Sequence, residues 1–303
     1  MTVWHWWRQS LARRAAHKAE EFLRRSQSDR WFLLAGFCEQ SDLSAPPVDR
    51  LNPLYPPDDV FWADPFAWRR DGRDFVFFEE CPYASRRGRI SVLELDGQAR
   101  PKGAAVPVIE EPYHLSYPFL FEFEGGLYMV PEKKATRRVD VYRCVEFPGR
   151  WERVKTLISG LRIVDATLFE HEGRWWMFCA VKLKWKGLRY DETLFAFYAD
   201  NPLSGEWIPH PANPLLRDFS LGRSGGRIQR DGDGRLLRPS QDCVRHYGDG
   251  LNVSEITLLT PDEYQERRLW HRSGEEAGGW HGMHHMDWHQ GLMVMDAQRP
   301  IAP

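Results

Sequence analysis

From Leu168 to Phe178 the chain reads LFEHEGRWWMF, in which apolar and polar residues alternate on both sides of a glycine. Alternation of this kind around a turn residue is typical of a tight β-hairpin. The phrase Asp165-Ala166-Thr167 precedes this hairpin, and the related phrases Ala63-Asp64-Pro65-Phe66 and Ser116-Tyr117-Pro118-Phe119 precede two earlier ones. The repetition predicts a protein built from copies of one β-unit.

Five hairpins of this kind follow one another along the chain. Their turns lie at Asp71-Gly72, Gly125-Gly126, Gly173, Asp231 to Gly234, and Gln290-Gly291. The copies recur roughly every 48 to 59 residues, the spacing of propeller blades, in which four short strands form a unit that packs against its neighbours. We therefore predict an all-β fold, a five-bladed β-propeller over residues 31–303.

Two segments lie before the first hairpin. The apolar run Trp31–Phe37 has the length and content of a buried strand but no hairpin partner, so we expect it to complete the last blade and close the ring. Residues 1–30 place Trp4, Trp7 and Leu11 at helical spacing with several arginines among them, which predicts a basic amphipathic helix. Its apolar stripe would pack on the propeller or, as the alternative, contact an anionic membrane surface.

Composition excludes several classes of protein. A net charge of -2 and an isoelectric point near 6.6 give no global reason to expect nucleic acid as a partner. The five cysteines are scattered and never form a Cys-x-x-Cys pair, which argues against a disulfide framework and a zinc site. Because we find neither a membrane-spanning apolar run nor a secretion signal, we expect a cytoplasmic protein.

The phrases that precede the inner strands should meet at one mouth of the channel. The innermost strand of each blade lines the channel, so Asp64, Tyr117 and Asp165 are expected there. The next strand runs antiparallel and its C-terminal end returns to the same mouth. The residues at these second-strand ends are Glu79, Glu80, Glu132, Lys133, Arg238, Gln241 and Asp242.

Carboxylates that face one another across a sugar-sized cleft suit acid/base work on a glycosidic bond, since one can be ionised while another is held protonated. We therefore take Asp64, Asp165, Glu132 and Glu80 as candidate catalytic residues. In the alternative interpretation, Asp64 and Asp165 only cap the start of a strand by accepting backbone N–H bonds.

Several cations and hydrogen-bonding residues are expected beside these carboxylates. Arginine forks suit phosphate or carboxylate oxygens, so the ligand could be a nucleotide sugar, a phospholipid-linked glycan or an acidic sugar. Alternatively, the cations neutralise the carboxylates of the pocket. The candidate binding residues are His114, Tyr117, Lys133, Lys182, Arg223, Arg227, Arg238, Gln241 and His284.

A metal site is not expected among the C-terminal histidines. In β-structure His284 and His285 should point to opposite faces, and no cysteine or acidic pair has matching spacing. We expect His284 to donate a hydrogen bond to a sugar hydroxyl, and we expect no cofactor.

The phrases carry a resemblance to known families. Ala63-Asp64-Pro65-Phe66 and Asp165 resemble the five-bladed propeller glycoside hydrolases of family 43, which implies Asp64 as general base and Asp165 as the residue that tunes the pKa of the acid. Over roughly residues 31 to 298 the chain more closely resembles the N-terminal domain of plant glucosamine inositolphosphorylceramide transferases and its bacterial counterparts. The motifs that carry this second resemblance are Phe61 to Phe66, His114 to Phe119, Asp165 to Phe169 and Arg238 to Asp242.

One departure from the hydrolase pattern matters for function. The fourth copy opens with Gly222-Arg223-Ser224-Gly225-Gly226-Arg227, where those hydrolases usually place the acid that protonates the leaving group. Either Glu132 or Glu80 supplies the acid from a neighbouring blade, or the protein does not hydrolyse glycosides by that mechanism.

Three functions remain open on the sequence. The favoured one is a carbohydrate-active protein that works on a glycosidic bond in glycan or glycolipid assembly, by glycosyl transfer. The second is a glycoside hydrolase with Asp64 as general base. The third is a non-catalytic glycan-binding module that serves a partner glycosyltransferase.

Overall fold

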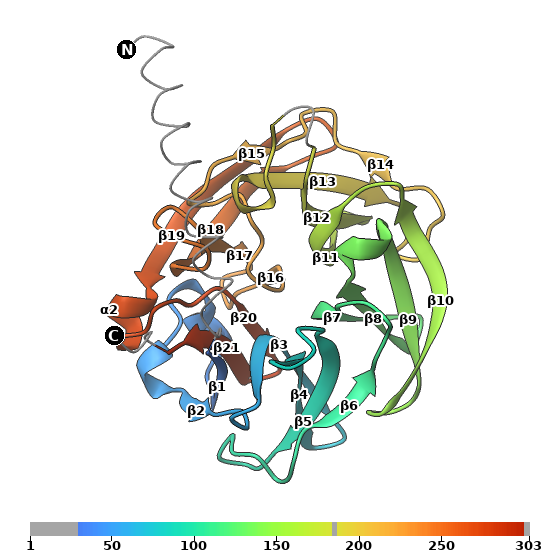
Figure 1. The fold of residues 1–303 in the computed structure, drawn as a ribbon. Coiled ribbons are helices and arrows are strands. Elements are labelled where there is room, and N and C mark those ends of the chain that lie inside the picture. Colours follow the sequence, from blue (N-terminus) through green and yellow to red (C-terminus); the bar gives the residue numbers. More distant parts are fainter. Residues whose placement is uncertain (1–29, 184–186, 300–303) are drawn as a thin grey trace.

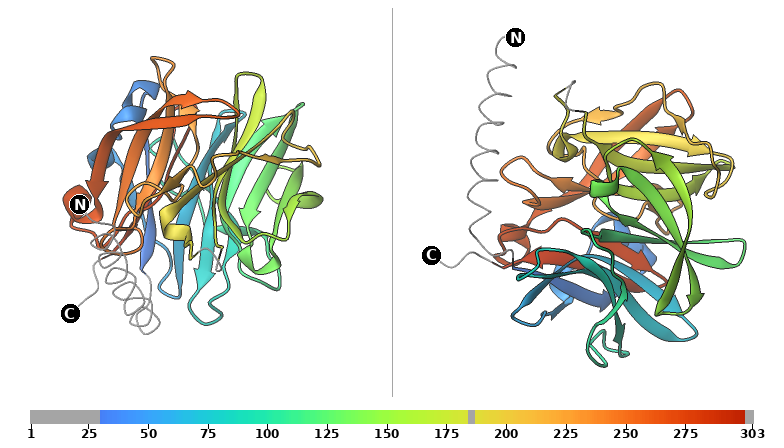
Figure 2. Two further views of the ribbon diagram at one scale, coloured as in Figure 1. Left: turned by 90° about the horizontal axis from the view of Figure 1, so that it is seen from above. Right: turned by 45° about the vertical axis from the view of Figure 1, so that its right-hand side comes forward.

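The computed structural model describes residues 30–183 and 187–299, and it is a ring of five antiparallel sheets around a central axis (Figure 1). Figure 2 shows the same ring from two further directions, with the strands of neighbouring blades running roughly along its axis. The predicted five-bladed propeller is confirmed. The predicted amphipathic helix over residues 1–30 lies almost entirely outside the described residues.

Each of the first three blades is built from consecutive strands, named from the channel outward. Blade 1 comprises β3 (Val60–Arg70), β4 (Arg73–Pro82), β5 (Arg89–Leu95) and β6 (Val106–Ile109). Blade 2 comprises β7 (Ser116–Phe123), β8 (Gly126–Glu132), β9 (Arg138–Glu146) and β10 (Arg150–Ser159). Blade 3 comprises β11 (Ile163–His171), β12 (Arg174–Val181), β13 (Thr193–Ala199) and β14 (Ile208–Pro209), and β15 (Leu216–Arg217) also pairs with β13.

The last two blades include the segment that closes the ring. Blade 4 comprises β16 (Gln229–Arg230), β17 (Leu236–Asp242), β18 (Gly250–Leu259) and β19 (Tyr264–Ser273), followed by the short helix α2 (Gly274–Gly278). Blade 5 comprises β20 (Met286–His289), β21 (Leu292–Gln298), β1 (Trp31–Phe37) and β2 (Asn52–Leu54). The short 3-10 helices are η1 (Gln40–Ser44), η2 (Val48–Arg50), η3 (Lys134–Thr136) and η5 (Tyr190–Glu192).

Closure of the ring follows the sequence prediction. Strand β1 pairs with β21 along its whole length, from Trp31 opposite Gln298 to Phe37 opposite Leu292. Because β1 comes from the start of the described chain and β21 from its end, this pairing joins the first and last parts of the propeller in one blade. Blade faces are buried in apolar clusters, the largest of which spans blades 1, 2 and 3.

The repeated phrases form β-bulges in the inner strands. The register of each inner strand shifts at the phrase, between Ala63 and Phe66 in β3, and at matching points in β7 and β11. Asp64, Tyr117 and Asp165 adopt left-handed backbone angles there, with φ of 52°, 45° and 54°. Such angles cost a non-glycine residue on the order of 1–3 kcal/mol, so the surrounding contacts must hold these residues in place.

The bulges release backbone groups from the strand ladders and direct them to side chains of neighbouring blades. The Asp64 N–H donates to Asp296 Oδ2 of blade 5 at 3.0 Å, and the Tyr117 N–H donates to Asp64 Oδ2 at 3.2 Å. The Tyr117 hydroxyl and Thr167 Oγ1 of blade 3 share a hydrogen bond of 2.7 Å. These contacts link four blades around the channel.

Candidate active site at one mouth of the channel

Asp64 is a buried carboxyl group at the start of the inner strand of blade 1, with 7% of its surface exposed. Its Oδ2 accepts the Tyr117 N–H, and its Oδ1 lies 3.7 Å from His284 Nε2 and 3.9 Å from His285 Nδ1. One backbone N–H does bind the carboxyl group, as the capping interpretation expects, but the second oxygen faces two imidazole rings.

Burial raises the pKa of Asp64 well above its usual value. The positive charge of His284 opposes this shift. The negative charges that raise the pKa of Asp64 further are those of Glu79, Asp296 and Asp165. The charges of Asp64 and Asp165 interact, so the two phrases contribute to one electrostatic cluster. A common catalytic role for the two residues stays a prediction.

His284 lies between two carboxyl groups. Its Nδ1 is 2.7 Å from Asp296 Oδ2, and its ring stacks on Trp31 with 4.1 Å between the ring centres. Burial lowers the pKa of His284, but the carboxylates of Asp296 and Asp64 outweigh this effect and raise it overall. His284 is only 2% exposed, so little of its surface is open to a ligand. The hydrogen bond from His284 to a sugar hydroxyl stays a prediction.

Asp165, the matching residue of blade 3, is also buried but has a cation beside it. Arg223 Nε lies 2.6 Å from Asp165 Oδ2, and Arg223 Nη1 lies 3.0 Å from Asp191 Oδ1. The guanidinium carbon of Arg223 lies 4.8 Å from the centre of the Tyr247 ring. Burial raises the pKa of Asp165 to about 6, Arg223 opposes the shift, and the charge and hydrogen bond of Glu132 add to it.

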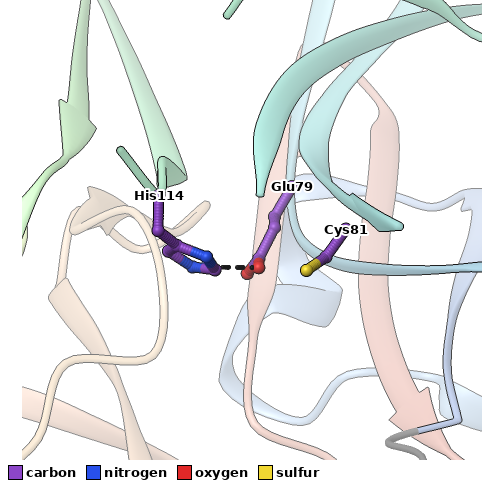
Figure 3. A group of neighbouring side chains, drawn as sticks. All are labelled: Glu79, Cys81 and His114. Carbon is purple, nitrogen blue, oxygen red and sulfur yellow. Dashed lines mark ion pairs between the residues drawn. The ribbon is translucent and has the colours of Figure 1, made fainter. Parts of the chain in front are cut away.

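Glu79 contacts His114, which lies in the connection between β6 and β7. Figure 3 shows Glu79 and His114 pointing toward one another, with Cys81 beside them, and His114 Nε2 is 3.1 Å from Glu79 Oε1. His114 Nδ1 accepts the Gly88 N–H at 2.9 Å, so the ring proton belongs on Nε2, facing Glu79.

Among the residues that the structure describes, two clusters each bring three potential metal ligands within 4.8 Å of one another, and neither suits a metal ion. A metal-bound histidine normally donates a hydrogen bond through its second nitrogen, whereas His114 Nδ1 accepts one. In the second cluster, Asp64, His284 and Asp296, the Asp296 carboxylate already accepts three backbone N–H groups. We assign both clusters to the positioning of carboxyl groups.

The structure does not bring Glu80 into this site. Glu80 lies one residue further along β4 than Glu79, so its side chain points to the other face of the strand. There its Oε2 accepts hydrogen bonds from Arg89 Nε at 3.0 Å and Ser91 Oγ at 2.6 Å. Its carboxylate is held within blade 1, and Glu132 remains as the candidate acid from a neighbouring blade.

The expected cluster of cations at the mouth is only partly present. Arg238 is fully buried inside blade 4, where its Nε and Nη2 bind Glu266 at 2.6 and 2.7 Å. Lys133 is buried in an ion pair with Asp140. For these two residues the predicted position at the mouth is wrong, because each finds a carboxylate within its own blade.

Three other predicted binding residues have different partners. Arg227 binds Asp287 at 2.7 Å and lies over the Phe119 ring, and Gln241 donates to the Ser224 carbonyl at 2.9 Å. Lys182 Nζ lies 5.5 Å from the centre of the Tyr190 ring. Tyr190 in turn interacts with the charges of Glu132, Arg223 and Asp165, so Lys182 belongs to the surroundings of Asp165.

Asp296 is a site residue that the sequence reasoning missed. It lies near the C-terminal end of the second strand of blade 5, the position that Glu79 and Glu132 hold in their blades. The rule that second strands return to the mouth therefore also applies to Asp296. The sequence signal for this residue is a single acid in the otherwise apolar run Leu292 to Ala297.

The fold and site define a five-bladed propeller with a cluster of buried carboxyl groups on its inner and second strands. The family model described as "Glucosamine inositolphosphorylceramide transferase 1, N-terminal" matches residues 54–296. The chain belongs to this family, which confirms the second resemblance seen in the sequence.

Plant proteins named glucosamine inositolphosphorylceramide transferase 1 are among the relatives. The protein of Oryza sativa subsp. japonica is 35% identical over 252 residues, which cover 79% of this chain and 33% of that protein. The protein of Arabidopsis thaliana is 34% identical over 237 residues, which cover 75% of this chain and 30% of that protein. The chain thus spans about a third of the length of the curated relatives it matches.

Solved structures share the fold at low sequence identity. The catalytic domain of the GH62 α-L-arabinofuranosidase of Coprinopsis cinerea matches with a TM-score of 0.58 and 11% identity, covering 78% of this chain and 90% of that one. A structure from the GH130 family of mannoside phosphorylases matches with a TM-score of 0.53 and 14% identity, covering 80% and 87%. These matches show a common propeller architecture.

None of the helices in the described parts of the chain is both long enough and apolar enough to span a membrane.

Proposed function

We propose that this protein is carbohydrate-active and works on a glycosidic bond in glycan or glycolipid biosynthesis, by glycosyl transfer. The observation that carries the proposal is the cluster of carboxyl groups at the mouth, in which burial and neighbouring charges raise the pKa of Asp64 and Asp165. Groups with such shifts mark functional sites, and paired carboxyl groups are the usual means of acid/base catalysis at a glycosidic bond. Membership of a family named for a glycolipid transferase agrees with this chemistry.

In glycosyl transfer, one carboxyl group takes the proton of the attacking hydroxyl while another gives a proton to the leaving oxygen. The acceptor would be a sugar or inositol hydroxyl, and the donor a nucleotide sugar or a phospholipid-linked glycan. Hydrolysis uses the same groups with water as the attacking molecule, so the product distinguishes the two reactions.

A second candidate is a non-catalytic glycan-binding module that serves a partner glycosyltransferase. The length comparison favours it, because two thirds of each plant relative lies outside the matched region and could carry the chemistry. We place either form in the cytoplasm on compositional grounds, with residues 1–30 as a peripheral membrane contact, and fractionation of the tagged full chain would test this.

The test uses purified full chain with UDP-N-acetylglucosamine and vesicles that contain inositolphosphorylceramide, followed by mass spectrometry of lipids and sugars. A glycosylated lipid that disappears in Asp64→Asn supports transfer, and free sugar alone supports hydrolysis. Neither product, together with retained binding of the vesicles or the donor, overturns the enzymatic proposal in favour of the binding module. Asp71→Asn is the matched control, because Asp71 shares the φ of 52° but its side chain is 88% exposed.

A further inference from the structure

Blades 1 and 3 contain the same bulge with an aspartate, but only the aspartate of blade 3 is paired with an arginine. Asp64 and Asp165 both occupy the left-handed position of a bulge at the start of an inner strand. Asp165 is bound by the Arg223 guanidinium through two nitrogens, at 2.6 and 3.4 Å. Among the described residues, no arginine or lysine forms an ion pair with Asp64. The nearest basic groups are the imidazoles of His284 and His285, and burial lowers the pKa of His285 to about 3.

Arg223 comes from the fourth copy of the repeat, where an acid would stand by analogy with the hydrolases. Its side chain is 11% exposed and is held by Asp165 and Asp191, so its charge stays fixed beside blade 3. A carboxylic acid at this place could donate a proton to the leaving oxygen, whereas an arginine supplies only a fixed positive charge. The proton that the reaction needs must then be held by another group.

We propose that Asp64 carries the proton for the leaving oxygen and that the hydrogen-bonded pair Glu132–Asp165 receives the proton of the attacking hydroxyl. This assignment rests on the proposed function and reverses the role of Asp64 that the resemblance to hydrolases implies. Glu132 is the more exposed member of the pair, at 8% against 1% for Asp165, so the proton enters through Glu132.

The step balances without a further reactant. The hydroxyl oxygen of the acceptor forms the new bond to the sugar carbon and gives its proton to the Glu132–Asp165 pair. The bond from that carbon to the leaving oxygen breaks, its electron pair stays on the oxygen, and Asp64 supplies the proton. The hydrogen bond between Glu132 and Asp165 already holds one proton, so after the step Asp64 is ionised and the pair holds one proton more than before. Exchange with solvent restores both groups.

Negative charges close to Asp64 favour its protonated form. Asp296 accepts three backbone N–H groups and lies 2.7 Å from His284 Nδ1, so its negative charge is fixed within 4.8 Å of the Asp64 carboxyl group. The charge of Glu79, whose side chain is held by His114, acts in the same direction. With these charges nearby, burial raises the pKa of Asp64 well above its usual value, whereas the pKa of Asp165, held by Arg223, rises only to about 6.

The groups around Asp64 come from every element that packs on it. They are Tyr117 of β7, His284 and His285 before β20, Asp296 of β21, Glu79 of β4, Asp165 of β11, and Tyr247 between β17 and β18.

The test measures protonation directly in the free full-length protein. Carbon-13 at the aspartate carboxyl position reports each titration by nuclear magnetic resonance, and Asp64→Asn and Asp165→Asn assign the two signals. We expect the Asp64 signal to be that of a protonated carboxyl at pH 7 and the Asp165 signal to titrate near pH 6. An ionised Asp64 at pH 7, or an Asp165 that titrates above Asp64, would overturn the inference.

Arg223 variants test the cause. Arg223→Gln should move the Asp165 titration upward, while Arg223→Lys should move it upward by less, because it retains the charge but loses the two-pronged contact. An unchanged Asp165 titration in Arg223→Gln would contradict the inference. If that variant fails to fold, Arg223→Lys and the wild-type titrations still decide the order of the two groups.

The lipid assay and the titrations distinguish failure of the proposed function from failure of the proton assignment. Absence of any turnover in the lipid assay overturns the proposed function and with it the reaction step. Turnover that depends on Asp64, combined with an ionised Asp64 at pH 7, overturns the proton assignment alone.

Discussion

Blade 1 and blade 3 of this propeller share a bulged aspartate at the start of the inner strand, but the charged groups around the two aspartates differ. In both, a bulge holds an aspartate in a left-handed conformation and directs it to the channel mouth. In blade 3, Arg223 from the next blade binds the carboxylate, whereas in blade 1 the neighbours are other carboxyl groups and two imidazoles. The difference teaches that a repeat sets where a group lies, while the partners from other blades set its charge.

The largest expected effect distinguishes Asp64 from an ordinary surface acid, Asp71. Asp64→Asn should reduce turnover of the glycosyl donor on the order of 10²-fold or more, because an amide cannot transfer a proton but keeps the shape of the carboxyl group. The rate is measured under saturating donor, with Asp71→Asn as control. Wild-type turnover in Asp64→Asn would remove Asp64 from the mechanism.

A donor with a better leaving group sharpens this result. A glycosyl fluoride needs less protonation on departure, so Asp64→Asn should retain much of the wild-type rate with this donor, whereas Glu132→Gln should lose activity with both donors. Equal losses for the two variants on both donors would contradict the division of roles between blades 1 and 3.

The second prediction removes Arg223, the cation that distinguishes the surroundings of Asp165 from those of Asp64. Arg223→Gln removes the cation that binds the buried carboxylate of Asp165 and the partly buried carboxylate of Asp191, so we expect the free energy of unfolding at pH 7 to fall by about 3 kcal/mol. Urea unfolding measures this change. The exposed pair of Arg100 and Asp96 supplies the control, since Arg100→Gln should leave the stability unchanged within error.

The third prediction concerns the stability cost of each aspartate. Asp64 has no arginine or lysine partner among the described residues and burial raises its pKa, so Asp64→Asn should stabilise the protein at pH 7. Asp165→Asn instead leaves the buried Arg223 with Asp191 as its remaining ion-pair partner, so we expect it to lower the free energy of unfolding by about 3 kcal/mol. The reverse order in urea unfolding at pH 7 would mean that Arg223 does not distinguish the two sites.

The smallest effect is a pH dependence that belongs to Asp165. Its pKa is raised to about 6 in the folded state, against roughly 3.9 when unfolded. Between these values the folded protein keeps a proton that the unfolded chain has lost, so the contribution of Asp165 to stability is fully present below the unfolded pKa and declines as the pH rises. The slope should reach at most about 1.4 kcal/mol per pH unit. The stability difference between wild type and Asp165→Asn, measured from pH 4 to 7, should show this decline, and a flat difference would argue against the raised pKa.

Much of the architecture could be predicted from the sequence because it depends on local patterns. Alternation around turns such as Asp71-Gly72 identified each hairpin, and the apolar run Trp31–Phe37 identified the strand that closes the ring. The rule that returns the ends of second strands, with Glu79 and Glu132, to the same mouth would have found Asp296, had it been applied to the last blade.

The pairings of charged groups could not be predicted in this way. Arg238 and Lys133 were expected at the mouth, but Glu266 and Asp140 hold them inside their blades. The side-chain direction at the end of a strand depends on a register that a single bulge changes, so Glu79 rather than Glu80 reaches His114.

The sequence by itself determined the number of blades, the closing strand and the mouth at which the repeated acids lie, because strand period and turn chemistry act between residues close together in the chain. Only the tertiary structure decided which acid receives a cation. Asp165 meets Arg223 across 58 positions and Asp64 meets Asp296 across 232 positions, and closure of the ring sets these distances. Electrostatic energy depends on distance in space and on burial, so the charge of each repeated group follows from the assembled ring.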